Sequence, residues 1–573
     1  MGTDQWEAIG READQDGASS GAVEVKGEEQ QPLVKNGTAN NDSVISVAPS
    51  DFGYNYGNRP YRDIAFSIAF AIFVTASLGV GIFAAFNRNS DYQLLGSASY
   101  SRDEGCTLPQ GFHDGASSGS LRFRHLLSLD SLPNSMVVLL FVFLATLVVM
   151  APVGFGFLYV LRKYAKEVVY VTIPFFVIIP AATAITLFVS CSMSAACQSA
   201  YDPTYRYFGL GLVLVLNVFY VWVLCRNWDR VELTIRIIRT ASEALHQNLA
   251  LLLVLPALNV SYLLYVIPAA FCLYFAYTNG KIVTNPEVVQ DPDLVCGDRY
   301  GGRPCCVWET DSWVPAYFVL TVFSMLWGSV IMAEIRVFTI SGTISQWYFS
   351  TAEASTVGNM KRSLANSFGP SFGTVCLSGL VVAFIQLIRS AIESSRSGRG
   401  EVGFAALIVR ACLMCLLSVV EFLTKFTTNF AAITGESFCG SAHMTYDLLR
   451  RNLLSTVVVE SVTARLLGQA VVVIAAVYGL LVWGGVTLFV QDGSRLWGGL
   501  WGFGVFACTI LMIFLVYCMQ VLLSVVDTVY ICFAMDKDHN EVSKPEVHDV
   551  YVLLPAADDG TASLAVSRPS TRS

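Results

Sequence analysis

Charge is scarce in this sequence. Only 14% of the 573 residues are charged, whereas 54% are hydrophobic and the mean hydropathy is +0.54. Soluble proteins carry about 25% charged residues, so the shortage excludes a soluble globular fold. The net charge of −8 also lies at the two ends, because residues 1–58 sum to −7 and residues 534–573 to −3, which leaves +2 for the body of the chain.

Motifs of nucleotide and metal chemistry are missing as well. The sequence has no G-x-x-x-x-G-K-[ST] loop, no H-E-x-x-H pair and no G-x-S-x-G at a strand-to-helix turn, and its six histidines are scattered. These absences argue against an ATP-driven pump, a zinc enzyme and a hydrolase. We therefore expect a protein that is not an enzyme, with no catalytic residues, no metal, no cofactor and no nucleic-acid partner.

Long apolar runs are what the chain has instead. Several exceed the roughly 18 residues that span a hydrocarbon core of about 30 Å, and the N-terminus lacks the pattern of a signal peptide. Hydropathy predicts an all-α, polytopic membrane protein with about ten transmembrane helices, near residues 63–86, 135–161, 168–190, 207–225, 249–277, 313–335, 372–393, 403–430, 466–490 and 501–526. We expect a transmembrane transporter domain over 59–533 and disordered, acidic tails over 1–58 and 534–573.

The basic residues of the short connections predict the orientation. One set of loops carries the larger share of bases, and by the positive-inside rule it faces the cytoplasm. With an even number of crossings, both termini are expected on that side, in a multi-pass protein of the plasma membrane or, as the alternative, of an internal membrane. The basic residues of this set are Arg162, Lys163, Lys166, Arg226, Arg230, Arg236, Arg239, Lys361, Arg362, Arg450 and Arg451. Residues 226–247 also show helical spacing and predict an interfacial helix.

Cysteines agree with this orientation. Of fifteen in the chain, six fall in the expected outer loops, an even set on the oxidising face, as disulfide pairing requires. They are Cys106, Cys191, Cys197, Cys296, Cys305 and Cys306. Cys191 and Cys197 are near enough in sequence to pair locally, but six cysteines allow about fifteen connectivities and the sequence leaves the choice open.

Three acidic residues stand inside apolar helices, where ionisable groups are costly and become functional candidates. Glu421 precedes Lys425 by one helical turn, which predicts a structural ion pair on one face. Asp527 has no basic neighbour in sequence and is either a cap at the helix end or a functional charge. Glu334 either marks the cytoplasmic boundary of the membrane or belongs to a binding site.

The segment around Glu334 is unusual in length. Only Glu334 and Arg336 are charged between Trp313 and Phe349. The uncharged run after them ends in Trp347, Tyr348 and Phe349 and contains Ser341, Gly342 and Ser345, which suits a bent or re-entrant segment. Trp327, Glu334 and Ser341 recur at seven-residue intervals and share one helical face. An aromatic ring and a carboxylate on one face can receive an organic cation.

Four blocks in the C-terminal half resemble the choline-transporter-like solute carriers. They are "SGTISQWYF" at 341–349, "GTVCLSGLVVAFIQLIR" at 373–389, "GESFCGSAHMTYDLLRRN" at 435–452 and "VDTVYICFAMDKD" at 526–538. The order of the blocks is that of the family. The chain departs from it in a short loop between the first two helices, in Thr374 and Ser378 where the family usually has Ser and Gly, and in "HNE" after Lys537-Asp538.

The resemblance implies ten transmembrane helices, cytoplasmic tails and movement of choline or related amines. Our leading hypothesis is a carrier that works by alternating access, with Trp327, Trp347 and Tyr348 as aromatic binding residues and Glu334 or Asp527 as counter-charge. Its partners are then a small organic cation and membrane lipids. Two alternatives stay open: a non-transporting membrane organiser that affects lipid supply or vesicle traffic, and a carrier for another substrate such as ethanolamine.

Overall fold

We describe the protein from a computed structural model. It describes residues 53–89, 134–193, 203–226, 228–285, 305–350, 359–394, 404–489 and 497–551, with Cys197 and a few positions between 91 and 107. The helices are α1 (Ile64–Phe86), α3 (Asn134–Met193), α5 (Pro203–Arg226), α6 (Trp228–Gln247), α7 (Ala250–Tyr277), α9 (Val314–Tyr348), α10 (Met360–Phe368), α11 (Phe372–Ser394), α12 (Phe404–Thr434), α13 (Phe438–Phe489), α14 (Trp497–His539) and α15 (Pro545–Tyr551). The strands are β1 (Ser99–Ser101), β2 (Gly105–Thr107), β3 (Gly280–Thr284) and β4 (Cys306–Thr310).

The predicted all-α membrane fold is confirmed. Among the described residues, eight helices are long and apolar enough to cross a membrane. One of them, α3, contains two of the predicted crossings and leaves helical geometry at Tyr164, with φ −128° and ψ 33°, inside the predicted basic connection. The predicted crossing at 403–430 corresponds to α12, which is not one of these eight helices. All ten predicted ranges are therefore helical.

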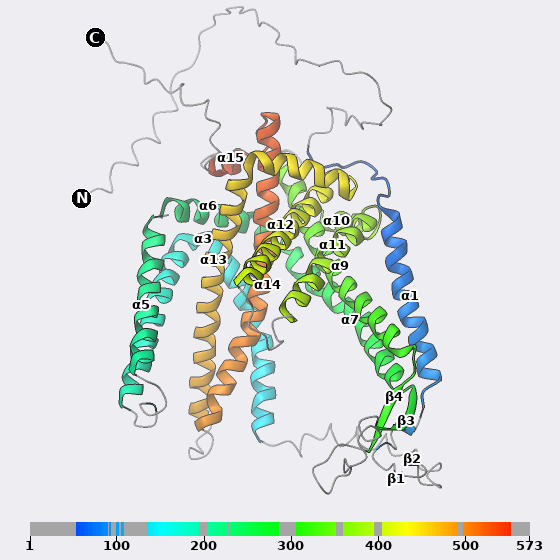
Figure 1. Ribbon diagram of the computed structural model, residues 1–573. Coiled ribbons are helices and arrows are strands. Elements are labelled where there is room, and N and C mark those ends of the chain that lie inside the picture. The colour runs from blue at the N-terminus through cyan, green and yellow to red at the C-terminus, as the bar shows by residue number, and fades with distance from the viewer. Residues whose placement is uncertain are drawn as a thin grey trace, which may run out of the picture. The chain divides into compact units, whose positions relative to one another are not determined.

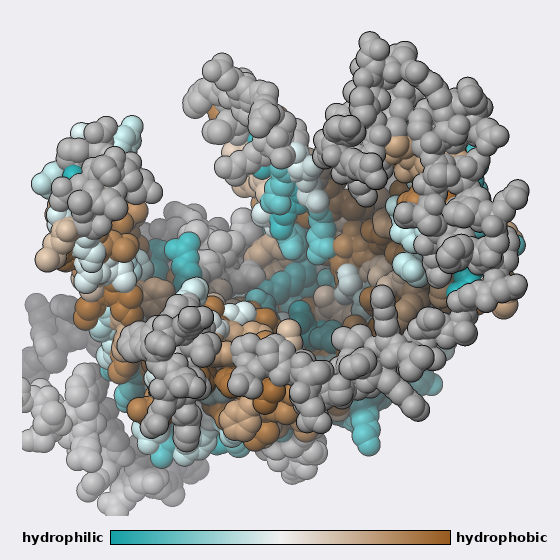
Figure 2. All heavy atoms as spheres, turned by 90° about the horizontal axis from the view of Figure 1, so that it is seen from below, coloured by the Kyte–Doolittle hydropathy of each residue, from teal (hydrophilic) through white to brown (hydrophobic). Residues whose placement is uncertain are grey.

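The helices run between two ends of the molecule (Figure 1). One, which we call the strand end, has the four short strands. The opposite one, which we call the α15 end, has α6, α10 and α15. Seen from the strand end, hydrophilic side chains gather inside a hollow whose surroundings are largely hydrophobic (Figure 2).

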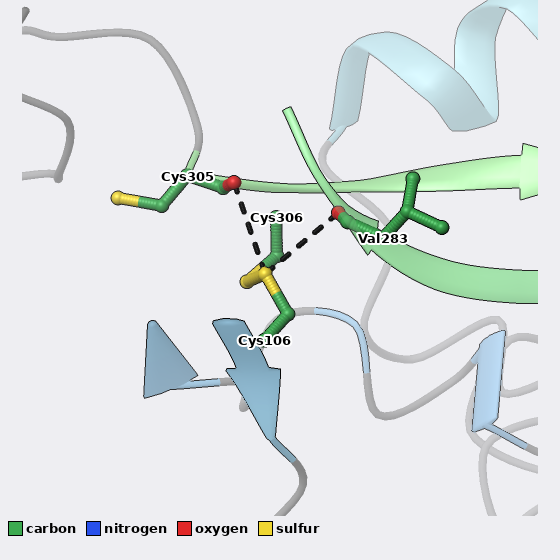
Figure 3. Close-up of a disulfide and its surroundings, with 4 residues drawn as sticks. All are labelled: Cys106, Val283, Cys305 and Cys306. Carbon is green, nitrogen blue, oxygen red and sulfur yellow. Dashed lines mark hydrogen bonds between the residues drawn. A yellow bond between two sulfur atoms is a disulfide. The ribbon is translucent and has the colours of Figure 1, made fainter. Parts of the chain in front are cut away.

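A disulfide ties the strand end together. β3 and β4 pair antiparallel between α7 and α9, with Ile282 opposite Trp308. Cys106 of β2 is bonded to Cys306 of β4 across 200 residues of sequence, and Cys106 Sγ lies 3.7 Å from the carbonyl oxygen of Val283 (Figure 3).

The remaining outer cysteines follow the prediction where they are described. Cys191 is bonded to Cys197, the local pair that the sequence allowed. Cys305 is also disulfide-bonded, whereas Cys296 lies outside the described residues. The Cys106–Cys306 bond thus links distant parts of the sequence, whereas the Cys191–Cys197 bond closes a local loop at the end of α3.

Helix α9 is the central element of the bundle. It packs on α1, α7, α10, α11, α12 and α14. The helix is continuous from Val314 to Tyr348, so the interpretation of a bent or re-entrant segment is wrong. At 35 residues it is about 52 Å long and exceeds the hydrocarbon core. Its small residues serve packing instead: a Cβ on Gly342 would lie 2.8 Å from Ser363 Oγ of α10, so a larger residue would displace that side chain.

Helix α6 is confirmed as a helix, but protein covers its apolar face. Ile235, Ile238 and Leu245 are buried, with exposed fractions of 6%, 0% and 0%. α6 packs on α3, α13, α14 and α15. Its hydrophobic face is therefore buried against other helices of the protein rather than against lipid.

The packed body extends beyond both expected tail boundaries. On the N-terminal side, the backbone nitrogen of Asn55 donates to the carbonyl oxygen of Ile433 at 3.1 Å. Arg59, the first residue of the expected domain, is 7% exposed and donates to the carbonyl oxygens of Ala432 at 3.0 Å and Ile433 at 3.1 Å. A guanidinium there satisfies carbonyls at the C-terminal end of α12 and meets the negative end of its dipole. On the C-terminal side, α14 continues to His539 and α15 follows, so part of the expected tail at 534–573 is helical.

Candidate functional site

A polar cavity of about 540 Å³ lies between α9, α11, α12 and α14. Its charged lining residues are Glu334, Arg336, Glu421 and Lys425. Other polar lining residues include Gln386, Gln520 and Ser524, and Phe422 supplies an aromatic ring. A cavity lined this way among hydrophobic helices matches the hydrophilic hollow of Figure 2 in character. It has the size of a small-molecule site.

Glu334 is held by hydroxyl groups of two other helices. Its Oε2 accepts a hydrogen bond from Ser378 Oγ of α11 at 2.8 Å and from Thr428 Oγ1 of α12 at 2.7 Å. The two hydroxyl oxygens are themselves 2.8 Å apart. The side chain is 7% exposed and lines the cavity. A buried carboxylate needs such donors, and these fix its position among three helices.

The other two predicted acids form ion pairs between helices. Asp527 of α14, 2% exposed, pairs with Lys425 of α12. Glu421 of α12 pairs with Arg389 of α11 at 2.8 Å. The predicted Glu421–Lys425 pair stays a prediction, because the ion pairs that the structure gives these residues connect each to a different helix. Pairing removes most of the cost of charges inside a membrane.

A second polar group lies next to the cavity toward the α15 end. Ser341 Oγ donates to Asn429 Oδ1 at 2.6 Å and lies 2.9 Å from Thr528 Oγ1. These residues join α9, α12 and α14, and all are fully buried. Within the described part of the chain, no group of three His, Cys, Asp or Glu side chains could hold a metal ion. The chemistry available here is hydrogen bonding and charge.

The predicted aromatic residues do not surround one site. Trp327 is 2% exposed, packs against Phe70 and Phe73, and donates from Nε1 to the carbonyl oxygen of Cys376 at 3.0 Å. It does not line the cavity among the described residues. Trp347 lies about 30 Å from Trp327 along α9, since each helical residue advances about 1.5 Å. The three residues therefore do not meet at one point, and their role as aromatic binding residues stays a prediction.

Trp347 and Tyr348 lie at the α15 end instead. Trp347 Nε1 donates to Gln247 Oε1 at 2.6 Å, and Lys544 Nζ lies 3.9 Å from the centroid of the indole. Tyr348 donates to Asp536 Oδ2 at 2.9 Å. Lys544 is half-buried, and this burial lowers the pKa of its ammonium group.

The sequence missed several residues that complete the site. Ser378 and Thr428 hold Glu334, and Arg389 neutralises Glu421. A signal for Thr428 was present, because Glu421, Lys425 and Thr428 recur at four- and three-residue spacing on one face of α12. Ser378 appeared only as a departure from the family pattern, and nothing in the sequence indicated that it faces Glu334.

Comparison with known proteins gives a consistent picture. Residues 211–538 match the family described as "Plasma-membrane choline transporter". A "CTL-like protein" of Dictyostelium discoideum is 30% identical over 152 residues, 25% of this chain and 27% of that protein. "Protein PNS1" of Gibberella zeae is 23% identical over 461 residues, 78% of this chain and 75% of the relative. "Choline transporter-like protein 5" of Macaca fascicularis is 24% identical over 299 residues, 48% of this chain and 40% of the relative.

The matches differ in extent. In the Dictyostelium and macaque proteins they span well under half of the relative's length, at 27% and 40%, whereas the Gibberella match spans most of both chains. The family match covers α7, α9, α11, α12 and the greater part of α14, and so includes every helix that lines the cavity.

Proposed function

This chain belongs to the plasma-membrane choline transporter family, and on that premise we propose that it moves choline or a related organic amine across the membrane by alternating access. The proposed protein is a multi-pass carrier with no ATPase of its own. We place it in the plasma membrane with the α15 end and both termini in the cytoplasm, in line with the basic residues of the loops at that end.

The charge state of the cavity carries the proposal. Glu421 is neutralised by Arg389 and Lys425 by Asp527. Glu334 receives two hydroxyl hydrogen bonds, but among the described residues no cationic group lies within ion-pair distance of it. Arg336 of the same helix also lines the cavity, and we propose that the Glu334 carboxylate is the negative charge that a cationic ligand meets there. A small organic cation is the ligand that such a charge selects.

The remaining lining suits a quaternary amine with a hydroxyl group. Choline has a permanent positive charge and no N–H donor, so its trimethylammonium group is best met by a carboxylate and an aromatic face. Glu334 of α9 and Phe422 of α12 supply these two features. Gln386, Gln520 and Ser524 offer hydrogen-bonding partners for the hydroxyl.

Alternating access requires a cavity that opens to one side at a time. The hydrophilic hollow is visible from the strand end (Figure 2), which supports an outward-facing conformation. Toward the α15 end, the contacts of Ser341 with Asn429 and of Tyr348 with Asp536 connect neighbouring helices. These contacts would block the passage of a substrate from the cavity to that end. We propose that these contacts separate when the carrier opens to the cytoplasm.

The test is amine flux through the purified protein. Radiolabelled choline uptake is measured in liposomes that contain only this protein, with protein-free liposomes as control and with unlabelled ethanolamine and tetramethylammonium as competitors. Saturable uptake inhibited by tetramethylammonium supports the proposal, and stronger inhibition by ethanolamine would identify that amine as the preferred substrate. The absence of flux for all three amines would instead support the membrane organiser.

A further inference from the structure

In this structure the ammonium group of Lys544 lies over the indole ring of Trp347. Lys544 Nζ lies 3.9 Å from the ring centroid, well within the roughly 6 Å over which a cation and an aromatic face attract each other. The ring is 5% exposed, and Lys544 belongs to the turn before α15. An ammonium group from the chain's own C-terminal segment thus covers an aromatic face at the α15 end.

The ring is positioned independently of the lysine. Trp347 Nε1 donates to Gln247 Oε1 at 2.6 Å, and Gln247 Nε2 in turn donates to Glu243 Oε1 at 3.2 Å. Glu243 also pairs with Arg162 of α3. Helices α3 and α6 therefore hold the indole plane in place, and the aromatic face would keep its orientation if Lys544 left.

Lys544, by contrast, belongs to a short element, since it directly precedes the seven-residue helix α15. After Asn540, which has a left-handed φ of 55°, the chain turns back, and Asp536 accepts hydrogen bonds from Ser543 N at 2.9 Å and Ser543 Oγ at 2.8 Å. α15 has only seven residues and is anchored by the buried side chains of Val547 and Tyr551. A unit of this size can detach without unfolding the helices beneath it.

Lys544 is also a poor match for an aromatic face. A primary ammonium is strongly hydrated and brings three N–H donors, and burial lowers the pKa of Lys544, which reflects the cost of removing water from it. A quaternary ammonium has no N–H donor to satisfy and loses less hydration on the same ring. Exchange of the lysine for such a cation therefore lowers the desolvation cost at this position.

We propose that the face of Trp347 is a second organic-cation site, at the cytoplasmic end of the carrier, which Lys544 occupies as an internal competitor. This inference rests on the proposed transport of choline-like amines and adds a site about 20 Å along α9 from Glu334. Tyr348, the next residue, donates to Asp536 of α14, which also accepts the hydrogen bonds of Ser543 and so joins the C-terminal segment, residues 540–551, to α9. An amine that takes the place of Lys544 therefore weakens the attachment of this segment to α9 and favours opening at this end.

The test compares amine affinity at the cytoplasmic face of several variants. Initial rates of radiolabelled choline uptake are measured in sealed inside-out vesicles, in which the α15 end faces the medium. Lys544→Gln removes the internal cation, Lys544→Arg keeps it, and Trp347→Leu removes the ring. Lys537→Gln, at an exposed lysine of the same segment, is the matched control. Trp347→Phe keeps an aromatic face in case the leucine variant fails to fold.

We expect Lys544→Gln to lower the half-saturating choline concentration about fivefold, the change that corresponds to loss of one cation–π competitor. Lys544→Arg and Lys537→Gln should resemble the wild type, and Lys544→Gln should have no effect on a Trp347→Leu background. An unchanged half-saturating concentration in Lys544→Gln, or the same fivefold change without the ring, overturns the proposal.

A binding measurement separates this proposal from the proposed function. Equilibrium binding of radiolabelled tetramethylammonium to purified wild-type protein and Lys544→Gln requires no transport. Tighter binding by the variant supports the Trp347 site even if no vesicle shows flux, in which case only the carrier function fails. Equal binding by the two proteins overturns the site even where choline flux is robust.

Discussion

At the residue scale, the acids inside the bundle differ in how their charge is met. Asp527 and Glu421 each have a basic partner on another helix. Glu334 accepts hydrogen bonds from the hydroxyl groups of Ser378 and Thr428, which orient its carboxylate and stabilise the negative charge without cancelling it. Ser378 and Thr428 are thus positioning residues for the counter-charge of the proposed substrate.

Loss of either hydroxyl should weaken amine binding. We expect Ser378→Ala and Thr428→Val each to raise the KM for choline about tenfold with little change in maximal rate, since a hydrogen bond to a charged group contributes about 1.5–3 kcal/mol. Ser378→Thr keeps the hydroxyl and should restore most of the affinity. The measurement is concentration-dependent uptake in proteoliposomes. A Ser378→Thr variant as weak as Ser378→Ala would show that side-chain volume, not the hydroxyl, matters here.

At the element scale, the helices were predictable and their neighbours were not. The length and apolarity of each run identified ten ranges that are helical in the structure, because the hydrocarbon core demands such runs from any membrane helix. Heptad spacing also placed Trp327, Glu334 and Ser341 on one face of α9. Spacing does not say which helix that face meets, so Trp327 was assigned to substrate although it packs against Phe70 and Phe73.

The same reason explains the partners of the buried acids. Lys425 was paired with Glu421 in the sequence because only neighbours along one helix can be read from spacing. In the structure it meets Asp527, more than one hundred residues away in sequence, because α12 and α14 pack together. The contact of Trp347 with Lys544 was equally hidden, since composition assigned the whole segment after residue 533 to a tail.

Close packing of elements predicts where added volume is not tolerated. A Cβ on Gly373 of α11 would lie 2.3 Å from the carbonyl oxygen of Asp63, a backbone atom that can move only with the start of α1. We expect Gly373→Ala to destabilise the protein by about 1–3 kcal/mol. Gly79→Ala is the control, because nothing lies within 4 Å of its Cβ position. Melting temperatures in detergent compare the two, and equal values would contradict this packing.

At the scale of the whole molecule, the disulfides should differ in their contribution. The Cys106–Cys306 bond links positions 200 residues apart, whereas Cys191–Cys197 spans only 6. Chain-entropy estimates give roughly 5 and 2 kcal/mol for loops of these lengths. We expect the double variant Cys106→Ser/Cys306→Ser to lower the melting temperature more than Cys191→Ser/Cys197→Ser does. The double change avoids leaving a thiol beside Cys305, and a larger loss in the second pair would refute the ranking.

Helix α9 connects the parts of the molecule on which transport would depend. It begins beside β4 at the strand end, carries Glu334 into the cavity, and ends with Trp347 and Tyr348 against α6 and the C-terminal segment. A ligand at Glu334 and a cation at Trp347 therefore act on one rigid element. This arrangement offers a physical route by which occupancy of the cavity biases the contacts at the α15 end.

The most direct measurement is choline uptake by purified protein with and without the charge of Glu334. Glu334→Gln keeps the shape and hydrogen-bonding capacity of the side chain, and Glu393→Gln, at the exposed end of α11, is the matched control. In proteoliposomes of equal protein content, we predict that Glu334→Gln reduces uptake at low choline concentration at least about tenfold, equivalent to roughly 1.4 kcal/mol of binding, while Glu393→Gln matches the wild type. Uptake by Glu334→Gln equal to that of the wild type would contradict the assignment of this carboxylate as the counter-charge.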